Sequence, residues 1–423
     1  MNKFLDFMNC AVTAYHAINT LESELRQNGF TELKENSEWN LSGDKFYVKR
    51  NNTSILTFKL SNSNKCKLTG FNITSSHSDS PTFKIKPNNL IDNGKYLKLN
   101  TEVYGGPILS TWLDRPLSFA GRVLIKENNE VVTRYVYIDK DILVIPNIAP
   151  HMHPEVAKGM QYNPQENMLP ILGMSGSGLN INKIISENLN IKEEDILDYD
   201  LFLVNREKAK IVGYNDEFIL SPRLDDLACA YTSLEGFLRS NNDNRINVFV
   251  CFDNEEVGSH TRQGAASDFL SNNLERLLYK LNINLEQKQM MYSNTFMLSC
   301  DNAHAVHPNM PQKTDQLNNT YLNGGIVLKY NANQSYTTDG LCGAHLRMIA
   351  QKANVKLQAF TNRSDVRGGS TLGNISNTQV SLHSCDIGLP QLAMHSSTEL
   401  CGKEDINSMI ELLTAFYNSN TKF

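Results

Sequence analysis

The sequence lacks the features that mark nucleic-acid-binding, membrane and secreted proteins. Acidic residues outnumber basic ones by 45 to 40, so the formal net charge is −5 and no basic excess favours nucleic acid. No apolar run approaches the roughly 20 residues that a membrane-spanning helix needs. The first residues, Met1 to Asp6, lack the layout of a signal peptide. We therefore expect a cytoplasmic protein that binds neither nucleic acid nor membranes.

Cysteines are few, and their spacing forms no metal-binding motif. None of the eight belongs to a Cys-x-x-Cys pair, so a zinc-finger site is not supported. Several lie within apolar runs, which is typical of free, buried thiols in a cytosolic protein. The eight are Cys10, Cys66, Cys229, Cys251, Cys300, Cys342, Cys385 and Cys401.

The composition is that of an ordinary globular protein. With 423 residues, 40% of them hydrophobic and 20% charged, the chain is long enough for a substantial core and, we expect, two domains. Apolar residues recur at helical spacing near the N-terminus, and β-type runs follow at 46–48, 54–58 and 71–75. The predicted helical face consists of Phe4, Phe7, Ala11, Tyr15 and Ile18.

The middle of the chain has the texture of a β domain. Short strand signals occur at 97–99, 123–125 and 135–138, and Glu127 to Glu130 predicts a hairpin turn. After Asp225 a helical period returns, and strands then alternate with helices up to a last helix from about Lys403, which indicates βαβ units.

These patterns predict an α/β fold with a mixed, largely parallel sheet flanked by helices. A mostly β domain, residues 88–220, is inserted into it, so the main domain consists of residues 1–87 and 221–423.

Adjacent charges at a strand end are the most informative feature of the chain. The apolar segment Ile246 to Phe252 predicts a strand, and Glu255 and Glu256 follow it almost at once. Folds of the α/β class keep their sites at such strand ends. Of two neighbouring carboxylates, one can bind a metal while the other transfers a proton. A solvated Glu-Glu turn is the alternative interpretation.

Histidine or acidic residues also occupy the ends of four other predicted segments. Nitrogen and carboxylate ligands suit zinc, and also manganese or cobalt. Two histidines and three carboxylates would hold two metals if one carboxylate bridged them. Taken singly, a histidine is often only hydrogen-bonded and an aspartate often caps a helix, but these roles do not explain the shared location. The four are His77, Asp225, Asp301 and His395.

Longer motifs resemble those of the M18 metallopeptidases, the aspartyl aminopeptidase family, essentially from end to end of the chain. The segments at 112–115 (Trp-Leu-Asp-Arg) and 304–309 (His-Ala-Val-His-Pro-Asn) are the most specific to that family, whereas a His-x-Asp motif such as 77–79 is widespread. Other matching segments are Tyr15-His16, Gly29-Phe30, Tyr104 to Gly106, Pro222 to Asp225, Glu255 to Ser259, Gln263 to Ala265 and Met394 to Ser396.

The resemblance implies a zinc-peptidase-like catalytic domain that holds two divalent metal ions, zinc or else manganese or cobalt. Asp301 and His77 would bind one ion, and Glu256 and His395 the other. Asp225 would bridge them, and the peptide bond that follows it is expected to be cis.

The catalytic residues implied by the resemblance are Glu255, Asp79 and His151. Glu255 would take a proton from a water that bridges the metals and pass it to the leaving amine, while Asp79 would orient His77. His151 would reach a neighbouring subunit's site and stabilise the oxyanion; a plain surface histidine is the alternative. The family's assembly, a tetrahedral dodecamer of dimers formed through the inserted domain, is expected here too.

Three residues match the substrate pocket of the family: His304, Lys329 and Tyr336. A lysine ammonium in a desolvated pocket favours an acidic side chain, so we expect removal of N-terminal Asp or Glu from peptides. Some family members prefer leucine, and a neutral preference is the alternative. Two departures from the family pattern, Pro150 and a Gly368–Gly373 loop without cysteine, leave the expected ligands intact.

Two rival assignments are weaker. A peptidase of the M42 type also uses a Glu-Glu pair and a bridging Asp, but the segments at 112–115 and 304–309 argue against it. A non-catalytic scaffold would be expected to lose a metal ligand or Glu255, and all are present. No glycine pair has the spacing of a phosphate-binding fingerprint.

Overall fold

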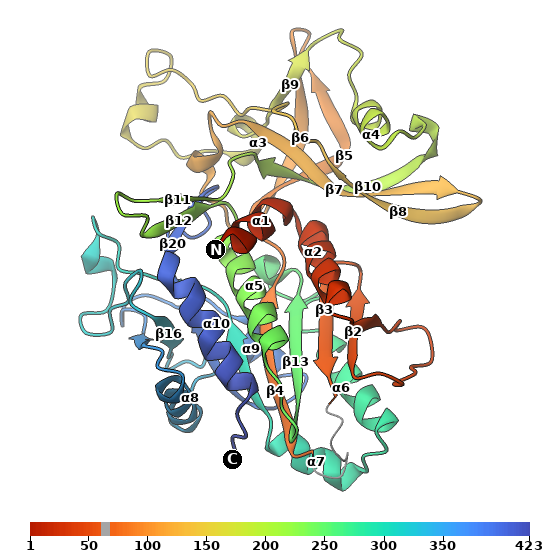
Figure 1. Ribbon diagram of the computed structural model, residues 1–423. Helices are drawn as coiled ribbons and strands as arrows, with labels where there is room; N and C mark the ends of the chain where they lie inside the picture. The colour runs from red at the N-terminus through yellow and green to blue at the C-terminus, as the bar shows by residue number, and fades with distance from the viewer. Residues whose placement is uncertain (61–67) are drawn as a thin grey trace. The chain divides into compact units, whose positions relative to one another are not determined.

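The computed structural model describes residues 1–60 and 68–423, which divide into two compact units (Figure 1). The domain limits expected from the sequence, at 87 and 220, lie further along the chain than the limits of these units. The first unit comprises Met1–Asp79, Ala209–Met394 and Glu399–Phe423, and the second comprises Ser80–Lys208 and His395–Thr398.

The first unit is built on a mixed, largely parallel sheet, which confirms the predicted fold class. Its central strands β13, β4, β14 and β18 are mutually parallel, and antiparallel pairs occur only nearer the edges, among the described residues. In order across the sheet the strands are β1 (Thr31–Glu32), β2 (Lys45–Arg50), β3 (Ser54–Lys59), β13 (Arg245–Phe252), β4 (Gly70–His77), β14 (Phe296–Cys300), β18 (His383–Gly388), β16 (Ile326–Lys329) and β17 (Leu357–Phe360).

Helices cover both faces of this sheet, so its central strands are buried along their whole length. Alternate residues of β13 belong to two cores: Phe249 and Cys251 pack with α5 and α10, while Val248 and Val250 pack with α6. The helices of this unit are α1 (Asn2–Cys10), α2 (Ala14–Gln27), α5 (Leu224–Arg239), α6 (Phe269–Lys280), α7 (Leu285–Ser293), α8 (Gly340–Lys352), α9 (Leu372–Ser376) and α10 (Lys403–Tyr417).

A smaller sheet completes the first unit. It connects the strand that precedes α5 with the strand that precedes α10, so it fixes where both helices begin. Its strands, in order, are β11 (Lys210–Val212), β12 (Phe218–Ser221), β20 (Glu399–Gly402), β19 (Pro390–Leu392) and β15 (Ala303–His304).

The N-terminal segment differs from the single helical face predicted for it. The apolar residues are all buried as expected, but the chain forms two helices, α1 and α2, with a break at residues 11–13. Thr13 has an extended backbone, and its hydroxyl lies 2.8 Å from Nδ1 of His16. A β-branched residue with a local hydrogen bond of this kind favours a new helix start over continuation.

The second unit contains an antiparallel sheet with a core of its own. The predicted hairpin is present: β7 ends at Glu127, β8 begins at Glu130, and Asn128 and Asn129 both have positive φ, as a tight two-residue turn requires. In order, the strands are β8 (Glu130–Tyr137), β7 (Leu117–Glu127), β10 (Ile196–Asn205), β5 (Thr82–Asp92), β6 (Tyr96–Tyr104) and β9 (Ile171–Met174), with helices α3 (Pro164–Asn167) and α4 (Ile181–Leu189).

The cysteines of the described residues are free thiols, as predicted, but one is not buried. Cys10 is exposed as the last residue of α1, whose buried residues are Phe4, Phe7 and Met8. Cys66 lies outside the described residues. Within residues 1–60 and 68–423, every helix is too short or too polar to cross a lipid bilayer.

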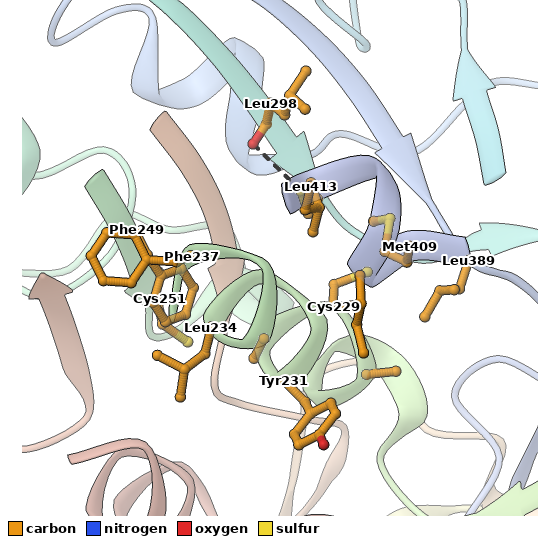
Figure 2. Close-up of a cluster of buried hydrophobic side chains, with 14 of the residues drawn as sticks. Cys229, Tyr231, Leu234, Phe237, Phe249, Cys251, Leu298, Leu389, Met409 and Leu413 are labelled. Carbon is orange, nitrogen blue, oxygen red and sulfur yellow. Dashed lines mark hydrogen bonds between the residues drawn. The ribbon is translucent and has the colours of Figure 1, made fainter. Parts of the chain in front are cut away.

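Close packing of α5 against α10 is the main contact between helices in the first unit (Figure 2). Phe237 of α5 stacks edge-on against Tyr417 of α10, with ring centroids 5.5 Å apart. Gly236 allows the two helices to approach, because a Cβ at that position would lie 2.7 Å from Cβ of Leu413.

Gly236→Ala is therefore expected to destabilise the protein by about 1–3 kcal/mol, because the added methyl group forces the helices apart. Gly340→Ala, at the open first turn of α8, is the matched control and should leave stability unchanged or slightly higher. Urea unfolding of both variants checks this; equal effects would contradict the packing argument.

Candidate functional site

Three parallel strands bring four predicted site residues of the first unit, His77, Asp301, Glu255 and Glu256, to one edge of its sheet. His77 is the last residue of β4 and pairs in register with Phe252, the last residue of β13. On the other side of β4, strand β14 ends at Cys300, directly before Asp301. The carboxyl ends of adjacent parallel strands meet at the same edge, so His77, Asp301 and the Glu255–Glu256 turn converge there.

His77 is the centre of this cluster and is buried. Its Nε2 lies 3.6 Å from Oδ1 of Asp225 and 3.9 Å from Oδ1 of Asp301. Its backbone N–H donates to Oδ2 of Asp226, at 3.1 Å. The imidazole therefore faces two carboxylates through one nitrogen, and a third carboxylate holds its backbone.

Asp79 connects the end of β4 to the Glu-Glu turn. Its Oδ1 accepts the backbone N–H of Glu255 at 3.1 Å, and its Oδ2 accepts that of Glu256 at 3.2 Å. Nδ1 of His77 lies 3.0 Å from the Asp79 carbonyl oxygen and 3.3 Å from its carboxylate. Such a partner on the second ring nitrogen orients a histidine whose first nitrogen binds a metal.

Asp225 is positioned by a hydrogen bond to its own backbone and by contacts of a residue just before it in the chain. Its N–H donates to Oε2 of the buried Glu399, at 3.0 Å. The preceding Arg223 has positive φ, and its guanidinium donates to the carbonyls of Met8 and Ala11 at the end of α1. The peptide bond between Asp225 and Asp226 is cis, as the resemblance implies.

Burial among like charges shifts the titration of these groups. Burial, with neighbouring carboxylates, raises the pKa of Glu255 to about 8 and that of Glu256 well above its ordinary value. Burial likewise raises the pKa of Asp301 to about 6. Burial alone would lower the pKa of His77, but Asp225 and Asp79 raise it well above its ordinary value. The cluster holds more negative charge than its surroundings stabilise.

The donor set of the cluster fits a divalent metal ion. Atoms of His77, Asp226 and Asp301 that can act as ligands lie within 4.8 Å of one another, and the same holds for His77, Glu255 and Glu256. Nitrogen and carboxylate oxygen without sulfur suit zinc, and a cation would compensate the buried charge. Asp226 is a further candidate ligand, beyond those that the sequence predicts.

Two predicted site residues belong to the second unit, His151 and His395. In that unit, Nδ1 of His395 lies 3.0 Å from the carbonyl oxygen of Gly106. Donation from Nδ1 would leave Nε2 as the ring's lone-pair nitrogen, the tautomer that a metal-binding imidazole needs. His151 is exposed. The catalytic role of His151 and the metal-binding role of His395 stay predictions.

The three predicted substrate-pocket residues gather around Phe360, at the end of β17. The rings of His304 and Tyr336 have centroids 6.3 and 6.4 Å from that of Phe360. Nζ of Lys329 lies 5.3 Å from the Tyr336 ring centroid. Phe360 carries no polar group, so nothing in its side chain indicates a place at this pocket.

The Lys329 ammonium is buried and already has protein partners. It donates to the carbonyl of Asn302 at 2.9 Å and lies 3.8 Å from Oδ2 of Asp301. Burial alone would lower the pKa of Lys329, but Asp301 raises it above the ordinary value, and Tyr336 and Asp386 act in the same direction. The cation therefore borders both the carboxylate cluster and the predicted pocket.

Comparisons with known proteins agree over nearly the whole chain. A family model described as "Aminopeptidase I zinc metalloprotease (M18)" matches residues 7–417. A probable M18 family aminopeptidase 2 of Clostridium novyi is 46% identical, covering 99% of this chain and 98% of the relative. Aspartyl aminopeptidase 1 of Schizosaccharomyces pombe is 35% identical, covering 98% and 94%.

Solved structures have the same fold. The chain from a cryo-EM structure of the Ape4 and Nbr1 complex gives a TM-score of 0.93 at 33% identity, covering 98% of this chain and 84% of that one. The M18 aminopeptidase of Thermotoga maritima gives 0.86 at 25% identity, covering 99% and 95%. The family match decides against the M42-type assignment, and the aminopeptidase names of relatives aligned over nearly the whole chain favour an enzyme over a scaffold. The chain belongs to the M18 family of zinc metalloproteases and is a metal-dependent aminopeptidase.

Proposed function

We propose that the protein removes acidic N-terminal residues, Asp or Glu, from peptides, using two divalent metal ions at the edge of the larger sheet. The observation that carries this proposal is the buried cluster around His77, which borders a buried cation at Lys329. The cluster supplies ligands and a proton acceptor, and the cation supplies a partner for an acidic side chain.

The proposed ligands follow the division implied by the resemblance. Asp301 and His77 would hold one ion, Glu256 and His395 the other, and Asp225 would bridge them. Zinc is the proposed ion, in keeping with the family description. When bound, two such ions polarise the scissile carbonyl and lower the pKa of a water.

Glu255 is the proposed general base. Its carboxylate takes a proton from the attacking water and later gives it to the leaving amine. The hydrogen bond from its backbone to Asp79 fixes the start of the turn that carries it. The other oxygen of the Asp79 carboxylate accepts the backbone N–H of Glu256, the proposed ligand. Asp79 therefore fixes the positions of the base and the ligand relative to each other.

The acidic preference rests on Lys329, which lies over the Tyr336 ring, while His304 packs near the same Phe360 ring as Tyr336. A desolvated ammonium attracts a carboxylate more strongly than a solvated one does. The name of the S. pombe relative, an aspartyl aminopeptidase, points the same way at 35% identity. A neutral preference has support of its own, since Asp301 and Asn302 already partner the ammonium.

We further propose that the chain assembles into a homo-oligomer, a tetrahedral dodecamer built from dimers through the second unit. One similar solved structure is described as the S. cerevisiae mApe1 dodecamer, with a TM-score of 0.85 and 25% identity. In such an assembly His151 would complete the site of a neighbouring subunit and stabilise the oxyanion. The cytoplasmic location stays a prediction from the sequence.

Glu255→Gln is expected to lower kcat by roughly 10²–10⁴-fold, because the amide cannot accept the proton. Its metal content, measured by mass spectrometry on the same sample, should match that of the wild type. Glu404→Gln, at an exposed position of α10, is the control and should keep full activity. Wild-type turnover by the Glu255 variant would remove this residue from the mechanism.

Lys329→Met keeps the length of the side chain and removes its charge. We expect kcat/KM for aspartyl and glutamyl substrates to fall roughly 30-fold or more relative to that for a leucyl substrate, because the acidic side chain loses its partner. Metal content must be measured alongside, since Asp301 loses its neighbouring cation. Equal losses on all three substrates would assign the lysine to the metal site alone.

His151→Ala and Glu255→Gln subunits, each inactive alone, should complement each other when co-expressed. Random pairing leaves roughly a quarter of the sites with both native residues if His151 acts on a neighbouring subunit. Activity of about that fraction of wild type is therefore expected in the mixed oligomer. Complete inactivity of the mixture would place His151 in its own subunit's site.

A further inference from the structure

Asp386 is a fully buried carboxylate in the middle of β18, with no part in the reaction described above. Burying a carboxylate is costly unless hydrogen-bond donors surround it. Its Oδ2 accepts the backbone N–H of Thr337 at 2.6 Å and the Thr337 hydroxyl at 2.7 Å, and its Oδ1 accepts the Thr371 hydroxyl. Its backbone N–H donates to the Thr338 hydroxyl at 2.9 Å.

These donors come from two separate loops. Thr337 and Thr338 belong to residues 330–339, the Tyr336 segment, which follows β16. Thr371 belongs to residues 368–373, the glycine-rich loop, whose last two residues are the first two of α9. Neither stretch is part of a sheet ladder. The Asp386 carboxylate accepts hydrogen bonds from both stretches, so it links them directly.

The glycine-rich loop comes unusually close to Asp386. A Cβ at Gly373 would lie 3.0 Å from Oδ2 of Asp386 and 2.9 Å from Cβ of Ser299. Any larger residue would push the loop away from the carboxylate. Glycine at this position therefore keeps the Thr371 hydroxyl within reach of Asp386.

Asp386 also faces the cation of the predicted pocket. It is directly opposite Lys329 in the antiparallel pair of β16 and β18, so the two side chains lie on the same face of the sheet. Lys329 in turn lies 3.8 Å from Asp301. The order Asp301, Lys329, Asp386 places one buried cation between two buried anions.

We propose that Asp386 is a positioning residue for substrate binding: it holds the Tyr336 segment and the glycine-rich loop in a fixed arrangement around Lys329. Tyr336 is the side chain through which this arrangement reaches the pocket, because it precedes Thr337 and packs on Phe360 and over Lys329. The proposal rests on the proposed assignment of Tyr336 and Lys329 to the substrate pocket.

The test compares Asp386→Asn with Asp405→Asn in the full-length, metal-loaded enzyme. Asp405 is a matched control, because its buried carboxylate also accepts backbone N–H groups, from Asn323 at 2.6 Å and Gly325 at 3.0 Å, but it contacts neither loop. We expect Asp386→Asn to raise KM about tenfold, because the variant loses a charge-assisted hydrogen bond. The values of kcat and of metal content should change little. Asp405→Asn should leave KM unchanged.

Thr371→Val and Thr337→Val remove single hydroxyl donors with almost no change of shape, and they serve if Asp386→Asn does not fold. Thr371→Val alone should raise KM several-fold, and adding it to Asp386→Asn should raise KM little further. An unchanged KM in the folded variants overturns the proposal, as does an equal KM increase in Asp405→Asn, which would indicate general loosening.

The outcome separates this proposal from the acidic preference. A wild type that cleaves leucyl substrates better than aspartyl ones would contradict the acidic preference. The positioning role would then still stand if Asp386→Asn raised KM for the leucyl substrate. Normal KM values of Asp386→Asn on every substrate would contradict the positioning role, whichever side chain the wild type prefers.

Discussion

The rest of the structure depends on compensating buried negative charge at one edge of the larger sheet. Asp225 and Asp301 face the same nitrogen of His77, and Glu255 and Glu256 follow the adjacent strand. Like charges in a low-dielectric site repel strongly, so ionised carboxylates stay together only if cations or hydrogen-bond donors surround them. A metalloaminopeptidase uses this arrangement, because the same excess of carboxylates attracts its ions.

Around this cluster, other buried carboxylates hold backbone. Asp79 accepts two backbone N–H groups of the Glu-Glu turn, Glu399 accepts that of Asp225, and Asp386 accepts that of Thr337. Each fixes a segment that carries a proposed ligand, base or pocket residue. Some buried carboxylates are therefore proposed to bind metal or transfer a proton, and others hold the backbone. These two roles together explain why acidic residues are so frequent in a buried region that also contains Lys329.

The sequence predicted the ends of the strands well, because apolar runs followed by polar residues are a local signal. The Glu255–Glu256 pair and Asp301 follow such runs, whereas turn residues predict the hairpin at Asn128–Asn129 and periodicity predicts the alternation of strands and helices. The family motifs then supplied the enzyme class, which no spacing argument could have reached. The sequence does not indicate the break between α1 and α2, because the apolar period continues through it.

Residues that act through long-range contacts could not be predicted. Glu399, Asp386 and Phe360 touch the site only because strands distant in the sequence pair with one another. Asp226 is adjacent in the sequence to the expected bridging residue, and only the fold shows its carboxylate at the backbone of His77. The ion pair between Lys329 and Asp301 was likewise invisible, since the sequence indicated a desolvated lysine and not its partner.

The most direct test of this account is the number of metal ions that the protein binds. Zinc is titrated into chelator-treated protein, and binding is measured by calorimetry. The titration should give two ions per chain, and peptidase activity should return in proportion to the zinc bound. Binding of two ions would mean that the buried carboxylates form a dinuclear site. Binding of one ion or none, with activity present, would contradict the central claim.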